Sequence, residues 1–383
     1  MITSKEVRNL SIQLGVPLPM IEKDYVMGWL LWGIYNNPML SSNLVLKGGN
    51  CLRKVYFHDT RFSDDLDFTA NNMDTENVFH SHLRAVCEAV NKASGIVFDF
   101  DRIRVEEKQM HDKDCKALDA RVYFKGFAGD SNLTMKIKFD ISDYERIILP
   151  VQHHPILHIY SDSEACKVQV ATYSLEEILA EKLRSWIQRT RPRDLFDVVK
   201  IVRSGVIPIS KKNILSTFFR KTLFKQLPLA GRDEMLFDNK FVTIEKSWLQ
   251  TICCPSMAFI TAVNAINLFK DFIKALFHPE ILRAVGITSP ESRYDYDIKS
   301  GIRETIIEAG KVRQLLRMRY NNKERDIEPY SFRYKVTTKG YAAEYFFGFD
   351  RTRGQSIKSF FLHQIQAVSI LPTKYIPRWA VEF

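Results

Sequence analysis

Two aspartates separated by one residue form the clearest chemical signal in this sequence. Asp65 and Asp67 alternate with Leu66 and Phe68, so a strand here would place both carboxylates on one face. Two adjacent carboxylates repel each other, and a divalent cation such as Mg²⁺ or Mn²⁺ removes that repulsion while also binding phosphate oxygens. The spacing therefore predicts a metal-binding pair suited to chemistry at phosphorus. The alternative is a solvated edge strand.

A third carboxylate lies in a segment of strict alternation. From Leu133 to Ile141 every second residue is apolar, and Asp140 falls on the polar side. Asp65, Asp67 and Asp140 together have enough oxygen ligands for the two ions that in-line displacement at phosphorus uses. We therefore expect Asp140 to complete the metal site.

A glycine turn precedes the acidic pair. Residues 44–49 predict a short buried strand that ends in Gly48 and Gly49, and a helix can begin directly after Asn50. Free backbone N–H groups at such a turn can bind a phosphate. The alternative is a tight turn in which glycine only supplies a positive φ.

A lysine lies on the apolar side of the amphipathic helix predicted over residues 174–189. Leu179, Leu183 and Trp186 belong to its apolar stripe, and at 100° per residue Lys182 falls within that stripe. A lysine that faces the interior is costly unless it reaches water or an anion. We expect an anion as its partner. Because the acidic pair suggests chemistry at phosphorus, we expect this anion to be a triphosphate.

The elements that must position these residues alternate between helix and strand in the N-terminal part. Residues 19–36 and 194–202 are further predicted helices, and residues 210–285 are mainly helical. Gly, Ser, Pro and Asp without apolar periodicity over residues 286–300 indicate a linker. One helix and several short strands follow, which predict a small β-barrel. These strands are expected at residues 314–320, 330–337, 343–350, 356–362 and 365–371.

Charge and composition exclude several classes of protein. The 383 residues include 55 Lys and Arg against 45 Asp and Glu, a net charge of +10 that favours a polyanionic partner. Residues 301–383 account for +7 of it. No apolar run is long enough to cross a membrane, and residues 1–15 do not have the pattern of a signal peptide, so we expect a cytoplasmic protein without membrane association. The six scattered cysteines predict reduced, structural thiols.

The motifs together resemble a known family. The segments LKGGNCLRKVYFHDTRFSDDLDFT, IKFDIS and EEILAEKLRSWIQRTRPRDLFDV look like the AbiEii/AbiGii toxin family of nucleotidyltransferases, in the DNA polymerase β superfamily. The resemblance implies an α/β (α+β) fold, with a polymerase-β-like core, a mixed sheet and a helical extension. It also implies metal-dependent transfer of a nucleoside monophosphate from a nucleoside triphosphate (NTP) to an acceptor, in some members the 3′ end of tRNA. Such proteins commonly act as toxins restrained by an antitoxin and serve in phage defence.

The resemblance also implies roles for individual residues. Asp65 and Asp67 would be metal ligands, and Asp140 a third ligand or the general base. Lys182 would hold the triphosphate, and Asp194 would be the acidic residue of the last motif, although helix capping is an alternative for it. The implied nucleotide-binding residues are Gly48, Gly49, Asn50, Arg61, Ser63 and Lys182. The superfamily often has Gly-Ser or Gly-Gly-Thr at the glycine turn, so Asn50 predicts altered nucleotide contacts.

The C-terminal part resembles WYL domains, which are small Sm-like barrels (Sm and SH3 folds share this shape) that sense nucleic acids or nucleotides. The similarity covers residues 327–379, but the arginine-containing pattern usual in those domains is absent. A basic strand surface with nearby aromatic residues still predicts nucleic-acid binding. Its candidate residues are Arg317, Arg319, Arg333 and Lys335. The alternative is a module for dimerisation or antitoxin docking.

We therefore expect a nucleotidyltransferase core in residues 1–205, its helical extension in residues 206–290 and a WYL-like barrel in residues 301–383. Two other functions remain open. One is a non-catalytic regulator that binds nucleotide and nucleic acid through the C-terminal domain. The other is a kinase-like enzyme that transfers the γ-phosphate with the same metal ions and lysine.

Overall fold

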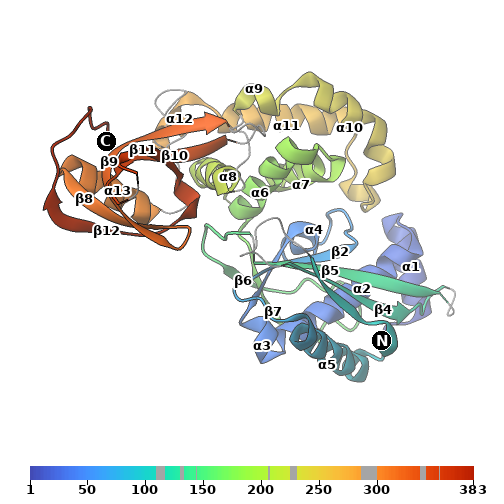
Figure 1. Cartoon of the computed structure of the whole chain (residues 1–383). Helices are drawn as coiled ribbons and strands as arrows, with labels where there is room; N and C mark the ends of the chain where they lie inside the picture. Colours follow the sequence, from blue (N-terminus) through green and yellow to red (C-terminus); the bar gives the residue numbers. More distant parts are fainter. Residues whose placement is uncertain are drawn as a thin grey trace. The chain divides into compact units, whose positions relative to one another are not determined.

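The chain folds into two compact units. The computed structural model describes residues 1–108, 117–129, 133–143, 145–205, 208–224, 231–285, 300–336, 342–352 and 354–383. Unit 1 comprises residues 1–209 and 236–272, and unit 2 comprises residues 210–235 and 273–383 (Figure 1). The segment 210–235, expected in a helical extension of the first domain, thus groups with the C-terminal unit. The predicted boundaries at residues 205 and 290 remain predictions.

Unit 1 is built on a seven-stranded mixed sheet in the order β3-β4-β5-β2-β1-β7-β6. The pairs β2–β5 and β1–β7 are parallel, and the other neighbours are antiparallel. A mixed α/β fold is therefore confirmed. The strands are β1 (Leu44–Lys47), β2 (Asp65–Ala70), β3 (Arg104–Lys108), β4 (Ala117–Lys125), β5 (Thr134–Ser142), β6 (Gln152–Pro155) and β7 (Gln169–Thr172).

Helices α2 and α5 cover the apolar face of this sheet. α2 packs against β5 and α5 against β3, and Figure 1 shows both helices on the same side of the blue-to-green strands. α2 is buried along most of its length because its sequence is apolar on nearly all sides. The helices of this part are α1 (Ser4–Leu14), α2 (Leu18–Tyr35), α3 (Pro38–Ser41), α4 (Gly48–Cys51) and α5 (Glu76–Ser94), with a π-helical turn at Leu52–Tyr56 after α4.

Two helices with defined ends follow the sheet strands of unit 1. α6 (Leu175–Arg189) begins at Ser174, whose hydroxyl accepts a hydrogen bond from the Glu177 backbone N–H. α7 (Pro192–Ser204) begins with a proline at its first position, two residues before the start of the helix predicted at residues 194–202. Trp186 packs against aromatic rings of the later helices α10 (Asp238–Thr251) and α11 (Ala262–Leu276).

Unit 2 contains a five-stranded antiparallel sheet, drawn in orange to red in Figure 1. Its core includes Ile306, Leu316, Met318, Ile327 and Phe346. The elements of this unit are α8 (Lys211–Phe224), α9 (Arg232–Met235), α12 (Pro279–Ala284), α13 (Ser300–Lys311), β8 (Gln314–Tyr320), β9 (Lys323–Val336), β10 (Ala342–Asp350), β11 (Ser356–Phe361) and β12 (Ile365–Lys374).

All five predicted C-terminal strands are present in this sheet. Pairings among the described residues give the linear order β11-β10-β9-β8-β12 without a pair that closes it. The sheet is consistent with a small β domain, and closure into a barrel remains a prediction.

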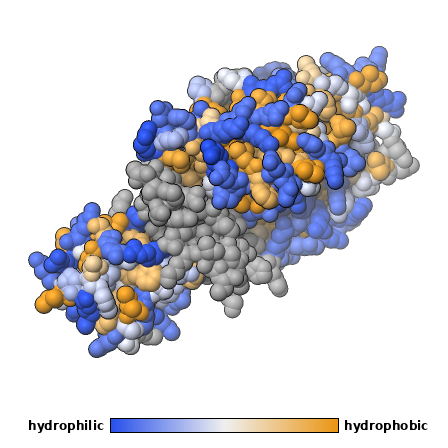
Figure 2. All heavy atoms as spheres, turned by 90° about the horizontal axis from the view of Figure 1, so that it is seen from above, coloured by the Kyte–Doolittle hydropathy of each residue, from blue (hydrophilic) through white to orange (hydrophobic). Residues whose placement is uncertain are grey.

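The surface mixes polar and apolar residues. On the face seen in Figure 2, orange hydrophobic residues lie between blue hydrophilic ones. Exposed hydrophobic residues include Val242 and Leu249 on α10 and Val263 and Leu268 on α11. Within the described residues, no helix combines the length and apolar composition that crossing a membrane requires.

Candidate active site

Carboxylates from two adjacent strands lie in one row across the sheet of unit 1. Asp67 is the register partner of Asp140 on β5 and of Lys47 on β1. Asp65, two residues earlier on β2, lies on the same face and is half-buried. The structure therefore brings the three predicted carboxylates together on one face of the sheet.

Asp67 is a half-buried carboxylate whose charge is disfavoured by its surroundings. Burial raises its pKa to about 6, and Asp140 and Asp65 add to the rise, although Lys47 and Lys182 oppose it. Burial also raises the pKa of Asp65. A pair of carboxylates that resists losing both protons is a donor set that suits a divalent cation.

Asp140 has a different environment. Its carboxylate accepts hydrogen bonds from Lys108 at 2.7 Å and Lys138 at 3.1 Å. Burial alone would raise its pKa, but the two lysines lower it. In the described part of the chain, no three His, Cys, Asp or Glu side chains converge as a metal cluster. Asp140 would have to give up a lysine contact before it could bind a metal ion, and metal binding by Asp65 and Asp67 remains a prediction.

The glycine turn lies directly against the acidic pair. Gly48 has φ +74°, and a Cβ atom built on it would be 2.2 Å from Oδ2 of Asp67. A Cβ atom on Gly49 would be 2.8 Å from both Nη2 of Arg61 and Oγ of Ser63. Both glycines therefore allow the turn to lie close to the side chains of Asp67, Arg61 and Ser63. Gly48 is also needed because the backbone has a positive φ there. Four of the predicted nucleotide-binding residues meet at this turn.

Asn50 is oriented toward the protein. Its side chain is fully buried, and its amide nitrogen donates a hydrogen bond of 2.6 Å to the backbone oxygen of Asp65. Its Oδ1 atom accepts no hydrogen bond from the described residues. In this structure Asn50 positions the start of β2, and its contact with nucleotide remains a prediction.

We expect Gly48→Ala to reduce the activity of this site by at least tenfold. The added methyl group meets the Asp67 carboxylate and strains a positive φ, at a cost on the order of 1 kcal/mol or more. Steady-state kinetics and thermal unfolding of the variant measure both effects. The matched control is Gly205→Ala, because Gly205 also has a positive φ (+58°) but no atom lies within 4 Å of its Cβ position. Equal losses of activity in the two variants would contradict the role assigned to Gly48.

Lys182 is buried between two carboxylates of α7. Its Nζ atom lies 3.2 Å from Asp194 and 2.8 Å from Asp197. Asp197 also forms two hydrogen bonds of 2.7 Å with Arg61, and Asp194 pairs with Arg189. The sequence predicted an anion for Lys182; in the structure that anion is supplied by the protein. Because the carboxylates outweigh the effect of burial, the pKa of Lys182 is raised and the lysine stays charged.

One sequence interpretation needs revision here, and one functional candidate was not predicted. Arg191 occupies the position before α7 and makes no capping hydrogen bond, and the Asp194 carboxylate contacts Lys182 and Arg189, so capping by Asp194 is not observed. Asp197 was missed. Its spacing of three residues from Asp194 places both carboxylates on one face of the helix, which is the signal that would have identified it.

A cavity of about 290 Å³ opens between the glycine turn and α6. Its wall carries four cations and three carboxylates, so it is polar and close to neutral. The cations are Lys47, Lys182, Arg184 and Arg189, and the carboxylates are Asp67, Glu145 and Glu181. Lys47 pairs with Glu181 at 3.5 Å, and Arg184 with Glu145 at 3.2 Å. An incoming polyanion can therefore replace carboxylates as the partner of these cations.

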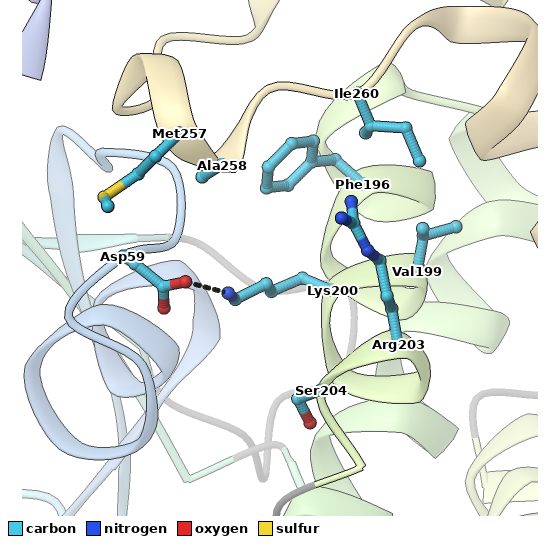
Figure 3. Close-up of a pocket in the computed structure, with 9 residues that line it drawn as sticks. All are labelled: Asp59, Phe196, Val199, Lys200, Arg203, Ser204, Met257, Ala258 and Ile260. Carbon is cyan, nitrogen blue, oxygen red and sulfur yellow. Dashed lines mark hydrogen bonds and ion pairs between the residues drawn. The ribbon is translucent and has the colours of Figure 1, made fainter.

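A second cavity, of about 200 Å³, lies on α7 and contains none of the predicted site residues. Figure 3 shows Lys200 and Arg203 reaching along it from α7, with Met257 on the opposite wall. Lys200 is bound to Asp59 at 2.6 Å. We assign no ligand to this cavity.

The predicted nucleic-acid residues of unit 2 are partly neutralised. Arg317 and Arg319 are exposed on β8, and Arg317 forms an ion pair with Asp326. Arg333 on β9 pairs with Glu382. The side chain of Lys335 lies outside the described residues. Nucleic-acid binding by this surface remains a prediction.

Comparisons with known proteins identify the class of enzyme. The model of the family "nucleotidyl transferase AbiEii toxin, type IV toxin–antitoxin system" matches residues 29–249, which include all the proposed catalytic residues. The chain is therefore a nucleotidyltransferase. It belongs to the AbiEii toxin family.

Two solved structures are similar to this chain. MenT4, a nucleotidyltransferase toxin from Mycobacterium tuberculosis, is 15% identical, with 76% of this chain and 96% of that chain covered and a TM-score of 0.48. A nucleotidyltransferase structure from H. pylori is 16% identical, with 70% and 97% covered and a TM-score of 0.43. No curated protein matches the sequence.

Proposed function

We propose that this enzyme transfers a nucleoside monophosphate from an NTP to an RNA acceptor, such as a tRNA 3′ end. The observation that carries the proposal is the set of carboxylates beside a polar cavity whose wall includes four cations. The carboxylates suit metal ions, and the cations suit a triphosphate. Family membership supports nucleotidyl transfer and the toxin class.

Asp65 and Asp67, with Asp140 as third ligand or base, would hold Mg²⁺ or Mn²⁺. Such an ion supplies charge neutralisation at the reacting phosphate. The acceptor oxygen bonds to the α-phosphorus, the bond to the pyrophosphate oxygen breaks, and pyrophosphate leaves. The hydroxyl proton passes to the Asp140 carboxylate, which the two adjacent lysines keep ionised.

The chain's own residues contribute binding and orientation. Lys182 and Arg189 line the cavity near Asp67, and Lys47 lies opposite Asp67 in the sheet, so three cations can bind the triphosphate. The backbone of the Gly48–Gly49 turn can approach the phosphates closely, as can the side chains of Arg61 and Ser63 at the same turn. Catalysis then rests mainly on positioning and electrostatic stabilisation.

We also propose a biological setting. A toxin of this family implies a cognate antitoxin and action in the cytoplasm, with phage defence as its role. The C-terminal sheet would be a WYL-like barrel that adds nucleic-acid contacts through Arg317, Arg319, Arg333 and Lys335. The resemblance of residues 327–379 supports this assignment.

The test is incubation of the purified protein with Mg²⁺, total tRNA and each α-³²P-labelled NTP in turn. We expect label on RNA with one or more nucleotides and none with the Asp65→Ala variant. Chelation of the metal should abolish the signal in the wild-type protein.

Parallel reactions with γ-³²P-labelled NTP distinguish nucleotidyl transfer from a kinase. Label transferred from the γ-position but not the α-position would replace the proposal with a kinase-like activity. RNA binding without any transfer would favour the non-catalytic regulator.

A further inference from the structure

An open, basic sheet face lies beside the carboxylate row. Strands β3, β4 and β5 bury one face beneath α2 and α5, and their other face is polar. Six cations and three carboxylates project from this polar face. The cations are Arg104, Lys108, Arg121, Lys125, Lys136 and Lys138, and the carboxylates are Glu106, Asp119 and Asp140.

Strand register connects this basic face to the active site. Arg121 is the partner of Lys138, and Lys138 is the partner of Asp65. Two residues further along the same two strands, Asp140 is the register partner of Asp67. The basic face therefore ends at the catalytic carboxylates without an intervening strand.

The cavity described above lies on the other side of the same carboxylates. Lys47 on β1 lines it, and β1 and β5 are the two neighbours of β2. Among the described residues, Asp67 is the one catalytic carboxylate that lines the cavity. Asp65 and Asp140 therefore separate a cavity suited to a triphosphate from a basic face that the triphosphate does not occupy.

Some cations of this face are available to a ligand, whereas Lys108, Arg121 and Lys138 form ion pairs with the carboxylates of the same face. Lys125 and Lys136 are exposed and make no ion pair within the described ranges of the chain. Arg121 and Lys138 keep about a third of their side chains exposed, at 35% and 32%. Tyr123 lies between Arg121 and Lys125 on the same face of β4 and is the register partner of Lys136. The guanidinium carbon of Arg102 lies 4.1 Å from its ring centroid. Exposed cations around an aromatic ring suit a chain of phosphates and bases.

We infer that the acceptor is a single-stranded 3′ end of nucleic acid that crosses the β3–β4–β5 face to present its terminal hydroxyl to Asp65 and Asp140. Three strands about 4.8 Å apart form a face about 10 Å wide, which suits one strand of nucleic acid. The inference rests on the proposed function and adds to it the path of the acceptor. The acceptor then meets the NTP across the carboxylate row.

The test is the double variant Lys125→Gln/Lys136→Gln, measured with a fluorescent single-stranded RNA that ends in a free 3′ hydroxyl. Neither lysine belongs to the catalytic machinery, and both are exposed, so the fold should be retained. We expect the RNA Kd and the acceptor KM to rise about tenfold, with kcat and the KM for NTP little changed. The slope of log Kd against the logarithm of the salt concentration should fall by about 1.4. Each phosphate contact on a single strand contributes about 0.7 to that slope, and the double variant removes two contacts.

The matched control is Lys5→Gln/Lys92→Gln, which removes the same charge from exposed positions on α1 and α5. Equal effects in the two double variants would overturn the inferred path and leave the proposed transfer intact. Wild-type protein that binds RNA but transfers nothing would contradict the proposed function, while the binding comparison would still decide the path. Transfer to a protein acceptor without RNA binding would also overturn the inference.

Discussion

Asp67→Asn should lower nucleotidyl transfer at least about a thousandfold, comparable to or larger than the loss of one strong electrostatic contact to a transition state. Asparagine keeps the volume that the Gly48 turn accommodates but removes the charge. Because partial burial and neighbouring carboxylates raise the pKa of Asp67, the substitution also removes a charge that the site disfavours, and thermal stability should be unchanged or higher. Single-turnover transfer and a melting curve measure the two effects.

The matched control for that variant is Asp64→Asn in the same motif. Asp64 pairs with Lys23 and Arg193 at the surface, where ion pairs contribute little. We expect a change in transfer of less than about threefold. Near-normal transfer by Asp67→Asn would remove Asp67 from the catalytic machinery.

Asp197→Asn should destabilise unit 1 by about 3–5 kcal/mol, because it leaves the buried cations Arg61 and Lys182 without their shared carboxylate. Urea denaturation followed by tryptophan fluorescence measures this free energy of unfolding. Asp59→Asn is the control, since Asp59 pairs with Lys200 at a partly exposed position. A loss below about 1 kcal/mol in Asp197→Asn would mean that Arg61 and Lys182 find other partners.

Local patterns were sufficient to predict many elements. Alternation at Asp65–Thr69 and Leu133–Ile141 identified β2 and β5 to within one residue at each end. The helix expected at residues 19–36 is α2, shifted by one residue. Alternation also put Asp65 and Asp67 on one face, because that depends only on the pleat of a single strand.

The pairing of strands could not be predicted in this way. β2 pairs with β5 although β3 and β4 lie between them in the chain, so the alignment of Asp67 with Asp140 follows from long-range register. The alternation of Leu118, Ala120 and Val122 in β4 was a usable signal that was missed. The edge strand β6 has the sequence QHHP and carries no such pattern.

The partner of Lys182 is a second feature that local sequence could not predict. Helical periodicity correctly indicated that this lysine faces inward and needs an anion. Whether the anion is a ligand or a neighbouring carboxylate depends on how α6 and α7 pack, and local sequence does not encode that geometry. The same packing places Asp197 beside Arg61, 136 residues away in the chain.

That separation has a consequence for the enzyme during its own synthesis. A ribosome adds roughly 5–20 residues per second, so about 7–27 seconds pass between the emergence of Arg61 and that of Asp197. Until then the nascent chain contains the aspartate pair but not the helix that anchors the preceding arginine. The buried ion pairs of Arg61 and Lys182 with Asp197 therefore cannot form until α7 has been translated.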